Sequence, residues 1–279
     1  MRADQFTKIV VGHGEGPVWW PPDGLRICDG YAGSVVSVDA TGQVTDRLAV
    51  GSFLGAFRPR TTGGLVAATA RSFVLVESDG TVRDQGELWA DADIRMNDGG
   101  CDPEGRFYCG SMLDDASRPV GSLFRLDPDG TVDVLLTDLG CPNGLVFTGD
   151  TVYFIDTNEQ RIDAFTRDHN GSWRDRHPVA RDLGKGMPDG MTIDAEGRLW
   201  VAMWGGSCVR CIDPSTGATV EIVEVPDAYQ TSACTFGGPD LDQLFITTST
   251  ARDQGGPLGG AVFVAEPGVR GLLPEPFRG

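Results

Sequence analysis

The sequence lacks any apolar run long enough to cross a membrane, and its first residues, Met1 to Phe6, have no apolar core of the signal-peptide kind. Positive charge is scarce as well. The chain has 23 Lys and Arg against 40 Asp and Glu, a net charge of −17. Such a balance disfavours nucleic acids and anionic membranes as partners and favours cations. We therefore expect a cytoplasmic protein that binds neither nucleic acid nor membrane.

A disulfide framework and helical periodicity are also missing. Seven cysteines are an odd number, which together with the absent signal peptide predicts reduced thiols. The one Cys-x-x-Cys pair, Cys208 and Cys211, falls in a predicted strand, where residues three apart point to opposite faces and share no metal. Apolar residues nowhere follow a sustained helical spacing, and 39 Gly and 17 Pro interrupt the chain too often for helices.

What the sequence does contain is a repeat. An apolar strand recurs every 40 to 47 residues, and a second strand with a Gly-containing turn follows most copies. The six first strands begin at Leu25, Leu65, Phe107, Val152, Leu199 and Leu244.

Six units of about four strands predict an all-β fold, a six-bladed β-propeller with four-stranded antiparallel blades. A two-sheet sandwich is the alternative, but its strands would not repeat as blocks of four. The count fits a single domain over residues 1–279. We expect residues 6–11 to add a strand to the last blade and close the ring, which would remove the open sheet edges.

Oxygen-bearing side chains stand at matching places in three of these units. Glu15 lies between glycines before an apolar strand, while Asn143 and Asp189 share a Pro-x-Gly frame 46 residues apart. Two carboxylates and an amide suit a hard cation such as Ca²⁺, Mg²⁺ or Mn²⁺. The competing interpretation is that Asn143 and Asp189 are ordinary turn residues, with Pro188 and Gly190 forming the turn that presents Asp189.

Several motifs, in order along nearly the whole chain, resemble the senescence-marker-protein-30/gluconolactonase family, which includes regucalcin and bacterial sugar lactonases. Their sequences are Gly-Glu-Gly-Pro-Val-Trp from Gly14, Arg-Met-Asn-Asp-Gly from Arg95, Pro-Asn-Gly-Leu from Pro142 and Pro-Asp-Gly-Met from Pro188. The family is a six-bladed propeller, in agreement with the repeat count. The resemblance implies a lactonase that hydrolyses a sugar lactone or similar small lactone to the hydroxy acid.

By the same resemblance, Glu15, Asn143 and Asp189 hold one divalent ion, which is Ca, Zn, Mn or Mg, and Asp189 is also the catalytic base. Arg95 and Asn97 contact the lactone. Asp115 takes the place of a family acid that binds sugar hydroxyls, although Asp is shorter than the usual Glu and Ser111 replaces a Thr. The ion would polarise the lactone carbonyl and stabilise the oxyanion.

Other readings stay open at this stage. The same ligands would serve a calcium-binding regulatory propeller without turnover, and the scaffold would also serve a phosphotriesterase or another metal-dependent esterase. A protein-interaction platform is a third alternative. The sequence leaves undecided the lactone, the native metal, whether Asp189 or a metal-bound hydroxide is the base, and whether Asp98 binds a second ion. We expect a monomer or a weak homo-oligomer.

Overall fold

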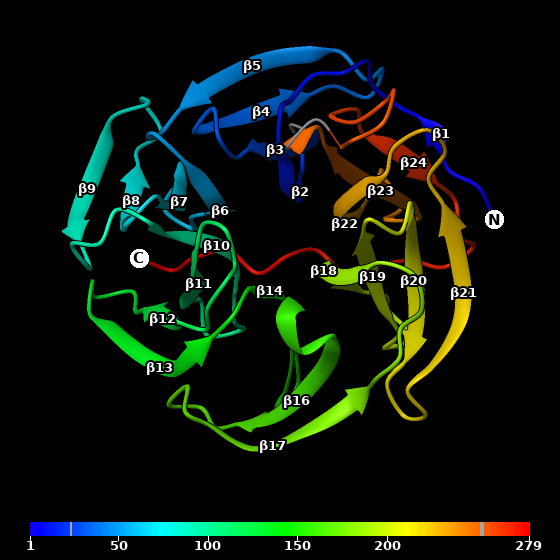
Figure 1. Cartoon of the computed structure of the whole chain (residues 1–279). Helices are drawn as coiled ribbons and strands as arrows, with labels where there is room; N and C mark the ends of the chain where they lie inside the picture. The colour runs from blue at the N-terminus through cyan, green and yellow to red at the C-terminus, as the bar shows by residue number, and fades with distance from the viewer. Residues whose placement is uncertain (23, 252–253) are drawn as a thin grey trace.

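Antiparallel sheets arranged around a central axis make up the protein, as the computed structural model shows for residues 1–22, 24–251 and 254–279 (Figure 1). The part of the chain that it describes has one short 3₁₀ helix, η1 (Thr157–Glu159), and otherwise strands and turns. In these ranges no helix has the length and hydropathy needed to cross a bilayer. The expectation of an all-β fold with four-stranded antiparallel sheets is confirmed.

The strands fall into four sets by their distance from the axis (Figure 1). The innermost strands are β2 (Gly14–Trp20), β6 (Leu54–Pro59), β10 (Ile94–Cys101), β14 (Pro142–Thr148), β18 (Met187–Ile193) and β22 (Gln230–Gly237). The second strands are β3 (Gly24–Asp29), β7 (Leu65–Thr69), β11 (Phe107–Leu113), β15 (Thr151–Asp156), β19 (Leu199–Trp204) and β23 (Gln243–Ser249).

The third strands are β4 (Ser34–Val38), β8 (Ser72–Val76), β12 (Gly121–Leu126), β16 (Arg161–Arg167), β20 (Cys208–Asp213) and β24 (Phe263–Ala265). The outermost are β5 (Val44–Ala49), β9 (Val82–Glu87), β13 (Val132–Leu139), β17 (Trp173–Ala180), β21 (Ala218–Glu224) and β1 (Asp4–Gln5). The repeat found in the sequence corresponds to the second and third sets. The innermost and outermost strands complete each sheet.

Hydrogen bonding groups these strands into four four-stranded sheets and one eight-stranded sheet. The larger sheet consists of two sets of four strands joined by a single residue pair between β19 and β22, Trp204 with Gln230. The six innermost strands contact one another in the closed order β2, β6, β10, β14, β18, β22 and back to β2. This inner ring surrounds the channel.

Burial follows the same order from the axis outward. The second strands are almost wholly buried, whereas β9 is exposed along its whole length and carries Arg83, Asp84 and Glu87. Charged side chains on an outer edge discourage pairing with other chains, since an exposed strand edge otherwise invites strand addition. Apolar side chains fill the space between neighbouring sheets, for example Phe73 of β8 against Phe107 of β11 at a ring distance of 5.7 Å.

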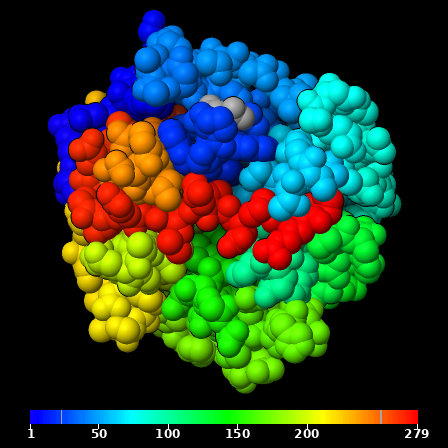
Figure 2. All heavy atoms as spheres, turned by 180° about the vertical axis from the view of Figure 1, so that it is seen from behind, coloured from blue at the N-terminus to red at the C-terminus, as the bar shows by residue number. Residues whose placement is uncertain are grey.

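Both ends of the chain are tied to the ring. The expected strand at residues 6–11 is wrong in its position, because the terminal strand is β1, which pairs with β24. Residues 6–11 follow it without forming a strand and donate hydrogen bonds to Val262 and Gly260. The C-terminal tail crosses the back of the ring (Figure 2). Gly271 is bonded to Leu241 on one side, and the Phe277 amide to Pro59 on the other.

A buried aspartate organises the turn between β18 and β19. Asp194 is 1% exposed and accepts hydrogen bonds from the backbone of Glu196 and Arg198, the Arg198 guanidinium and the Trp200 indole. The equivalent Asp102 accepts from the Arg106 backbone and the Tyr108 hydroxyl. Loss of such a buried carboxylate leaves several donors without an acceptor, among them the buried Trp200 indole, and leaves Arg198 with Glu196 as its remaining acidic partner.

Replacing Asp194 should therefore destabilise the whole domain. We expect Asp194→Ala to lower the free energy of unfolding by about 3–5 kcal/mol, measured by denaturant titration. Asp240→Ala, which removes an exposed acid paired with Arg270, is the matched control and should stay within about 0.5 kcal/mol of wild type. Equal effects of the two substitutions would contradict this account of the turn.

Candidate functional site

Each of the six innermost strands has a β-bulge at the same place. The register shifts between Glu15 and Val18 in β2 and between Leu54 and Ala56 in β6, and the other four strands have the same irregularity. A bulge bends the strand and redirects the side chain at that point. Glu15, Asn97, Asn143 and Asp189 all lie at these bulges.

The bulges replace the turns that the sequence suggested. Pro188, Asp189 and Gly190 belong to β18, so the expected turn around Asp189 is wrong. Close packing explains why glycine follows both Asn143 and Asp189. A Cβ at Gly144 would lie 2.8 Å from the Asp189 carbonyl oxygen, and one at Gly190 would lie 2.5 Å from the Ala233 Cβ. The inner strands approach too closely there for any other residue.

Two tiers of residues follow from this alignment, because residues two apart on a strand share a face. The lower tier lies at the bulges and consists of Glu15, Gly55, Asn97, Asn143, Asp189 and Ser232. The upper tier lies two residues earlier and consists of His13, Phe53, Arg95, Cys141, Met187 and Gln230.

One cavity of about 400 Å³ contains most of both tiers. Its walls include all six residues singled out from the sequence, namely Glu15, Arg95, Asn97, Asp115, Asn143 and Asp189. Their side chains come from β2, β10, β14, β18 and the loop after β11. The structure therefore brings together residues up to 174 positions apart, and their individual roles remain predictions.

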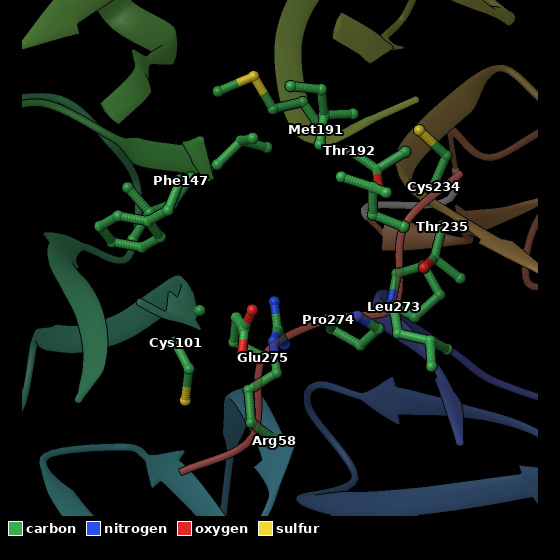
Figure 3. A pocket seen from close by; sticks show the side chains of 16 residues that line it. Arg58, Cys101, Phe147, Met191, Thr192, Cys234, Thr235, Leu273, Pro274 and Glu275 are labelled. Carbon is green, nitrogen blue, oxygen red and sulfur yellow. The ribbon is translucent and has the colours of Figure 1, made fainter. Parts of the chain in front are cut away.

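A second cavity of about 320 Å³ lies farther along the same inner strands (Figure 3). Arg58, Phe147, Met191 and Thr235 contribute to its wall, and the C-terminal tail closes one side through Leu273 and Glu275. None of the six candidate residues lines it. The oxygen-rich cavity therefore lies toward the starts of the inner strands, and the second cavity toward their ends.

Acidic side chains face one another in the channel. Burial, and to a smaller extent the nearby Asp98 carboxylate, raise the pKa of Glu15 to about 8, against the opposing effects of the Gly16 backbone amide and the Arg95 charge. Burial likewise holds the pKa of Asp189 well above its usual range, with added repulsion from Glu15 and Asp98. Burial also raises the pKa of Asp98, and Arg58 opposes this. Asp98 thus raises the pKa of both Glu15 and Asp189, and such repulsion between partly desolvated acids favours a nearby positive charge.

Arg95 is fixed by several partners. Its Nε donates to Asp114, and its Nη1 donates to Asn97 Oδ1 at 2.8 Å. The guanidinium also lies 4.6 Å from the Phe53 ring centroid, a cation–π distance. Asp114 is thus a residue that the sequence reasoning missed, since its neighbour Asp115 was chosen by counting from Met112.

Asp115 also lines the cavity, but it is exposed and its Oδ1 accepts from the Ser117 backbone at 2.9 Å. His13, just before β2, contacts Ser249 Oγ through Nδ1 at 2.8 Å. Burial, together with the smaller effect of the Arg95 charge, lowers the pKa of His13 to about 4. His13 is therefore a neutral wall residue at physiological pH.

A directed chain of hydrogen bonds fixes the amide of Asn143. Its Nδ2 donates to Thr157 Oγ1 at 2.8 Å, and Thr157 donates to the Pro188 carbonyl at 2.7 Å. At the other end, Asn97 Nδ2 donates to Asn143 Oδ1 at 3.2 Å. A carbonyl only accepts and the Arg95 guanidinium only donates, so both ends determine the direction of the chain.

The amide oxygen of Asn143 therefore faces away from Thr157. This is the atom that an oxygen-binding cation needs, and Thr157 connects it to the residue before Asp189. Thr157 is not among the residues that the sequence analysis singles out. Its position in η1, just past the end of β15, explains how it reaches two inner strands.

Glu15, Asn143 and Asp189 supply two carboxylates and one amide oxygen, a donor set that suits hard divalent cations. Within residues 1–22, 24–251 and 254–279, no three side chains drawn from His, Cys, Asp and Glu group closely enough to hold a metal ion. The candidate ligand set therefore needs the Asn143 amide as its third member. The raised pKa values of its two carboxylates, Glu15 and Asp189, show that a positive charge beside them would be stabilising.

The fold and the cavity define a β-propeller with an oxygen-donor pocket in its channel. Residues 13–250 match the SMP-30/Gluconolactonase/LRE-like region, and the chain belongs to this family. It is 33% identical to regucalcin of Xenopus laevis, over 95% of each chain. It is 34% identical to the pentonolactonase XacC of Haloferax volcanii, over 91% of this chain and 88% of that one.

Among solved structures, a calcium-binding protein described as regucalcin, from Agrobacterium tumefaciens, superposes with a TM-score of 0.88 at 26% identity. The superposition covers 100% of this chain and 97% of the other. The resemblance to the family drawn from the sequence motifs is therefore confirmed.

The raised pKa of Glu15 predicts how stability changes with pH when no divalent ion is present. Between about pH 6.5 and 8 the unfolded chain is ionised at Glu15 while the folded chain retains the proton. The folded state then binds more protons, so stability falls as pH rises. His13 acts in the opposite sense only below its ordinary pKa of 6.5.

We expect the melting temperature in chelator to fall from pH 6.5 to 8. The free energy of unfolding should decrease by at most about 1.4 kcal/mol per pH unit for each such group. Glu15→Gln should flatten the slope. A melting temperature that is constant or rises over this window would show that the acids are not buried as described.

Thr157 offers a test of the hydrogen-bond chain. Thr157→Val keeps the shape but leaves the Pro188 carbonyl without its donor and Asn143 free to turn its NH₂ toward the channel. We expect divalent-ion affinity, measured by calorimetry, to fall about 10- to 100-fold, the usual cost of losing a group that orients a ligand.

Thr157→Ser retains the hydroxyl and should bind as wild type does. Thr69→Val, which removes another buried hydroxyl that donates to the Ser72 carbonyl, controls for stability. Unchanged affinity in Thr157→Val, or an equal loss in Thr69→Val, would refute the orienting role.

Proposed function

We propose that the protein is a divalent-metal-dependent lactonase that hydrolyses a sugar lactone or a similar small lactone to the hydroxy acid. One observation carries the proposal. Glu15, Asn143 and Asp189 line one cavity together with Arg95 and Asn97, so ion-binding oxygens and hydrogen-bond donors surround the same space. The name of the Haloferax volcanii relative, a pentonolactonase, supports lactone hydrolysis as the reaction type.

The proposed scaffold is a ring of six blades, counting the eight-stranded sheet as two blades joined at Trp204 and Gln230. The pairing of β1 with β24 then closes the ring. All seven cysteines are unpaired, which supports a reducing compartment such as the cytoplasm.

Glu15, Asn143 and Asp189 would hold one divalent ion, Ca, Zn, Mn or Mg. When bound, this ion would supply Lewis acidity toward the lactone carbonyl. Its charge would also offset the burial that raises the pKa of both carboxylates and the added repulsion that Asp189 receives from Glu15.

Asp189 is the proposed base. Its carboxylate takes a proton from the attacking water, directly or through a second water. The water oxygen adds to the carbonyl carbon, the bond from that carbon to the ring oxygen breaks, and the ring oxygen receives the proton. Asp189 is 5% exposed, so bulk water competes little for its charge.

Arg95 and Asn97 would orient the lactone. Asp114 and Phe53 already hold the Arg95 guanidinium in place, so the substrate does not have to order a flexible side chain. Asp115, at the exposed end of the cavity, would contact substrate hydroxyls.

A calcium-binding protein without turnover is the second candidate. The structure from Agrobacterium tumefaciens is described as a calcium-binding protein, and the same three ligands would serve this function. The ordered Arg95 favours the lactonase, because a cation near the ligands weakens ion binding and is of no use to a pure ion buffer.

The deciding experiment is a pH-indicator assay of sugar lactones and unsubstituted lactones after chelation, with Ca²⁺, Zn²⁺, Mn²⁺ and Mg²⁺ returned singly. We expect turnover to vanish in chelator and to return with at least one ion. Asp189→Asn should lower turnover on the order of 10²- to 10⁴-fold, the usual contribution of a general base. Asp240→Asn, on the exposed surface, is the matched control.

Full activity in chelator would contradict metal dependence. Near-normal activity of Asp189→Asn would exclude it as the base. Ion binding without hydrolysis of any lactone would favour the calcium-binding alternative.

A further inference from the structure

The second cavity, toward the ends of the inner strands, has no part in the proposed function. Its volume is about 320 Å³, within the range of about 300–1,000 Å³ that is usual for small-molecule pockets. All six inner strands contribute to its wall, through Pro17, Arg58, Cys101, Phe147, Met191 and Thr235. The C-terminal tail covers one side (Figure 3). A space enclosed on this many sides can bury most of the surface of a small ligand.

Arg58 supplies positive charge to this wall. It is half-buried, and its guanidinium donates to two backbone carbonyls, from Nη1 to Phe57 at 2.6 Å and from Nη2 to Gly99 at 2.8 Å. These two bonds fix the guanidinium but use only part of its five N–H donors. The ion pairs found among the described residues do not include Arg58. A half-buried charge that is bonded only to neutral groups is stabilised by an anion beside it.

Much of the remaining wall is apolar. Phe147 and Met191 come from the inner strands, and Leu273 and Pro274 come from the tail. Figure 3 shows Arg58 on one side of the opening and Phe147 and Met191 on the other. A ligand that fills the cavity therefore needs a charged group at one end and an apolar body at the other, because the apolar wall contributes binding energy only where it covers apolar surface.

One acid limits the charge that such a ligand can carry. Among the described residues of the wall, Glu275 is the one carboxylate, and it lies on the same side of the opening as Arg58 (Figure 3). The net charge of the chain is −17. Both features repel a polyanion more than a monoanion, because the repulsion grows with the charge of the ligand. A carboxylate has a single charge and matches a guanidinium through two parallel hydrogen bonds, so it suits this wall better than a phosphate.

We propose that the second cavity is a binding site for a small monocarboxylate with an apolar body. The carboxylate pairs with Arg58, and the body packs against Phe147 and Met191 across the opening. This site goes beyond the proposed lactonase function and does not depend on it.

Octanoate is the probe, titrated by calorimetry into the full chain in chelator, so that its carboxylate cannot bind an ion in the channel. We expect it to bind more tightly than acetate, which lacks the apolar body, and than octanamide, which lacks the charge. Arg58→Gln should lower the octanoate affinity about 10- to 100-fold, the effect of losing hydrogen bonds to a charged group in a buried site. Arg83→Gln removes an exposed arginine of β9 and is the matched control, with an affinity within about twofold of wild type.

Glu275→Gln tests the same site in the opposite direction. Removing this like charge should raise the octanoate affinity roughly two- to fivefold and leave the octanamide affinity unchanged. Because Glu275 is exposed, this variant also decides the question where Arg58→Gln folds poorly. Glu266→Gln changes the net charge equally at an exposed position away from the cavity and is its control.

Octanoate that binds no more tightly than acetate, or that binds wild type, Arg58→Gln and Glu275→Gln equally, would overturn the inference. Inorganic phosphate that binds more tightly than octanoate would overturn it as well. Melting temperatures of all variants separate a lost ligand contact from unfolding. Each of these outcomes leaves the lactonase function standing, because none of its candidate residues lines the second cavity.

Discussion

Electrostatic repulsion between buried carboxylates is the constraint on which the channel depends. Burial raises the pKa of Glu15, Asp98 and Asp189, the Asp98 carboxylate adds to the shift of the other two, and Glu15 adds to that of Asp189. Two arginines offset only part of this negative charge. Arg95 lines the oxygen-rich cavity, and Arg58 lines the second cavity. A fold that concentrates acids in this way is stabilised by protons or by a cation, so ion binding and stability are linked.

The backbone makes this concentration possible. Each inner strand carries a bulge at the same level, so six segments far apart in sequence direct their side chains into one small volume. Gly144 and Gly190 let neighbouring strands approach at that level. The ring supplies rigidity, and the bulges determine the chemistry, since a different residue at a bulge would change the site without changing the sheets.

Much of the architecture could be predicted from the sequence, because the apolar strands and their turns recur with a nearly constant period. The position of Asp189 in a bulge could not, since Pro188 and Gly190 are equally typical of a turn. Asp114 and Thr157 were missed because their importance lies in contacts with residues distant in the sequence, Asp114 with Arg95 and Thr157 with Pro188. The placement of β1 was missed for a simpler reason, as two exposed polar residues give no strand pattern.

Calorimetric titration of the metal-free protein with Ca²⁺ at pH 6.5 and pH 8.5, in buffers of different ionisation enthalpy, tests the central claim most directly. If the buried acids hold the ion, about one ion should bind per chain, more tightly at the higher pH, with protons released to the buffer at the lower pH. Glu15→Gln should reduce the affinity. Binding that is absent for every divalent ion, or that neither releases protons nor responds to Glu15→Gln, would contradict a cation site among these carboxylates.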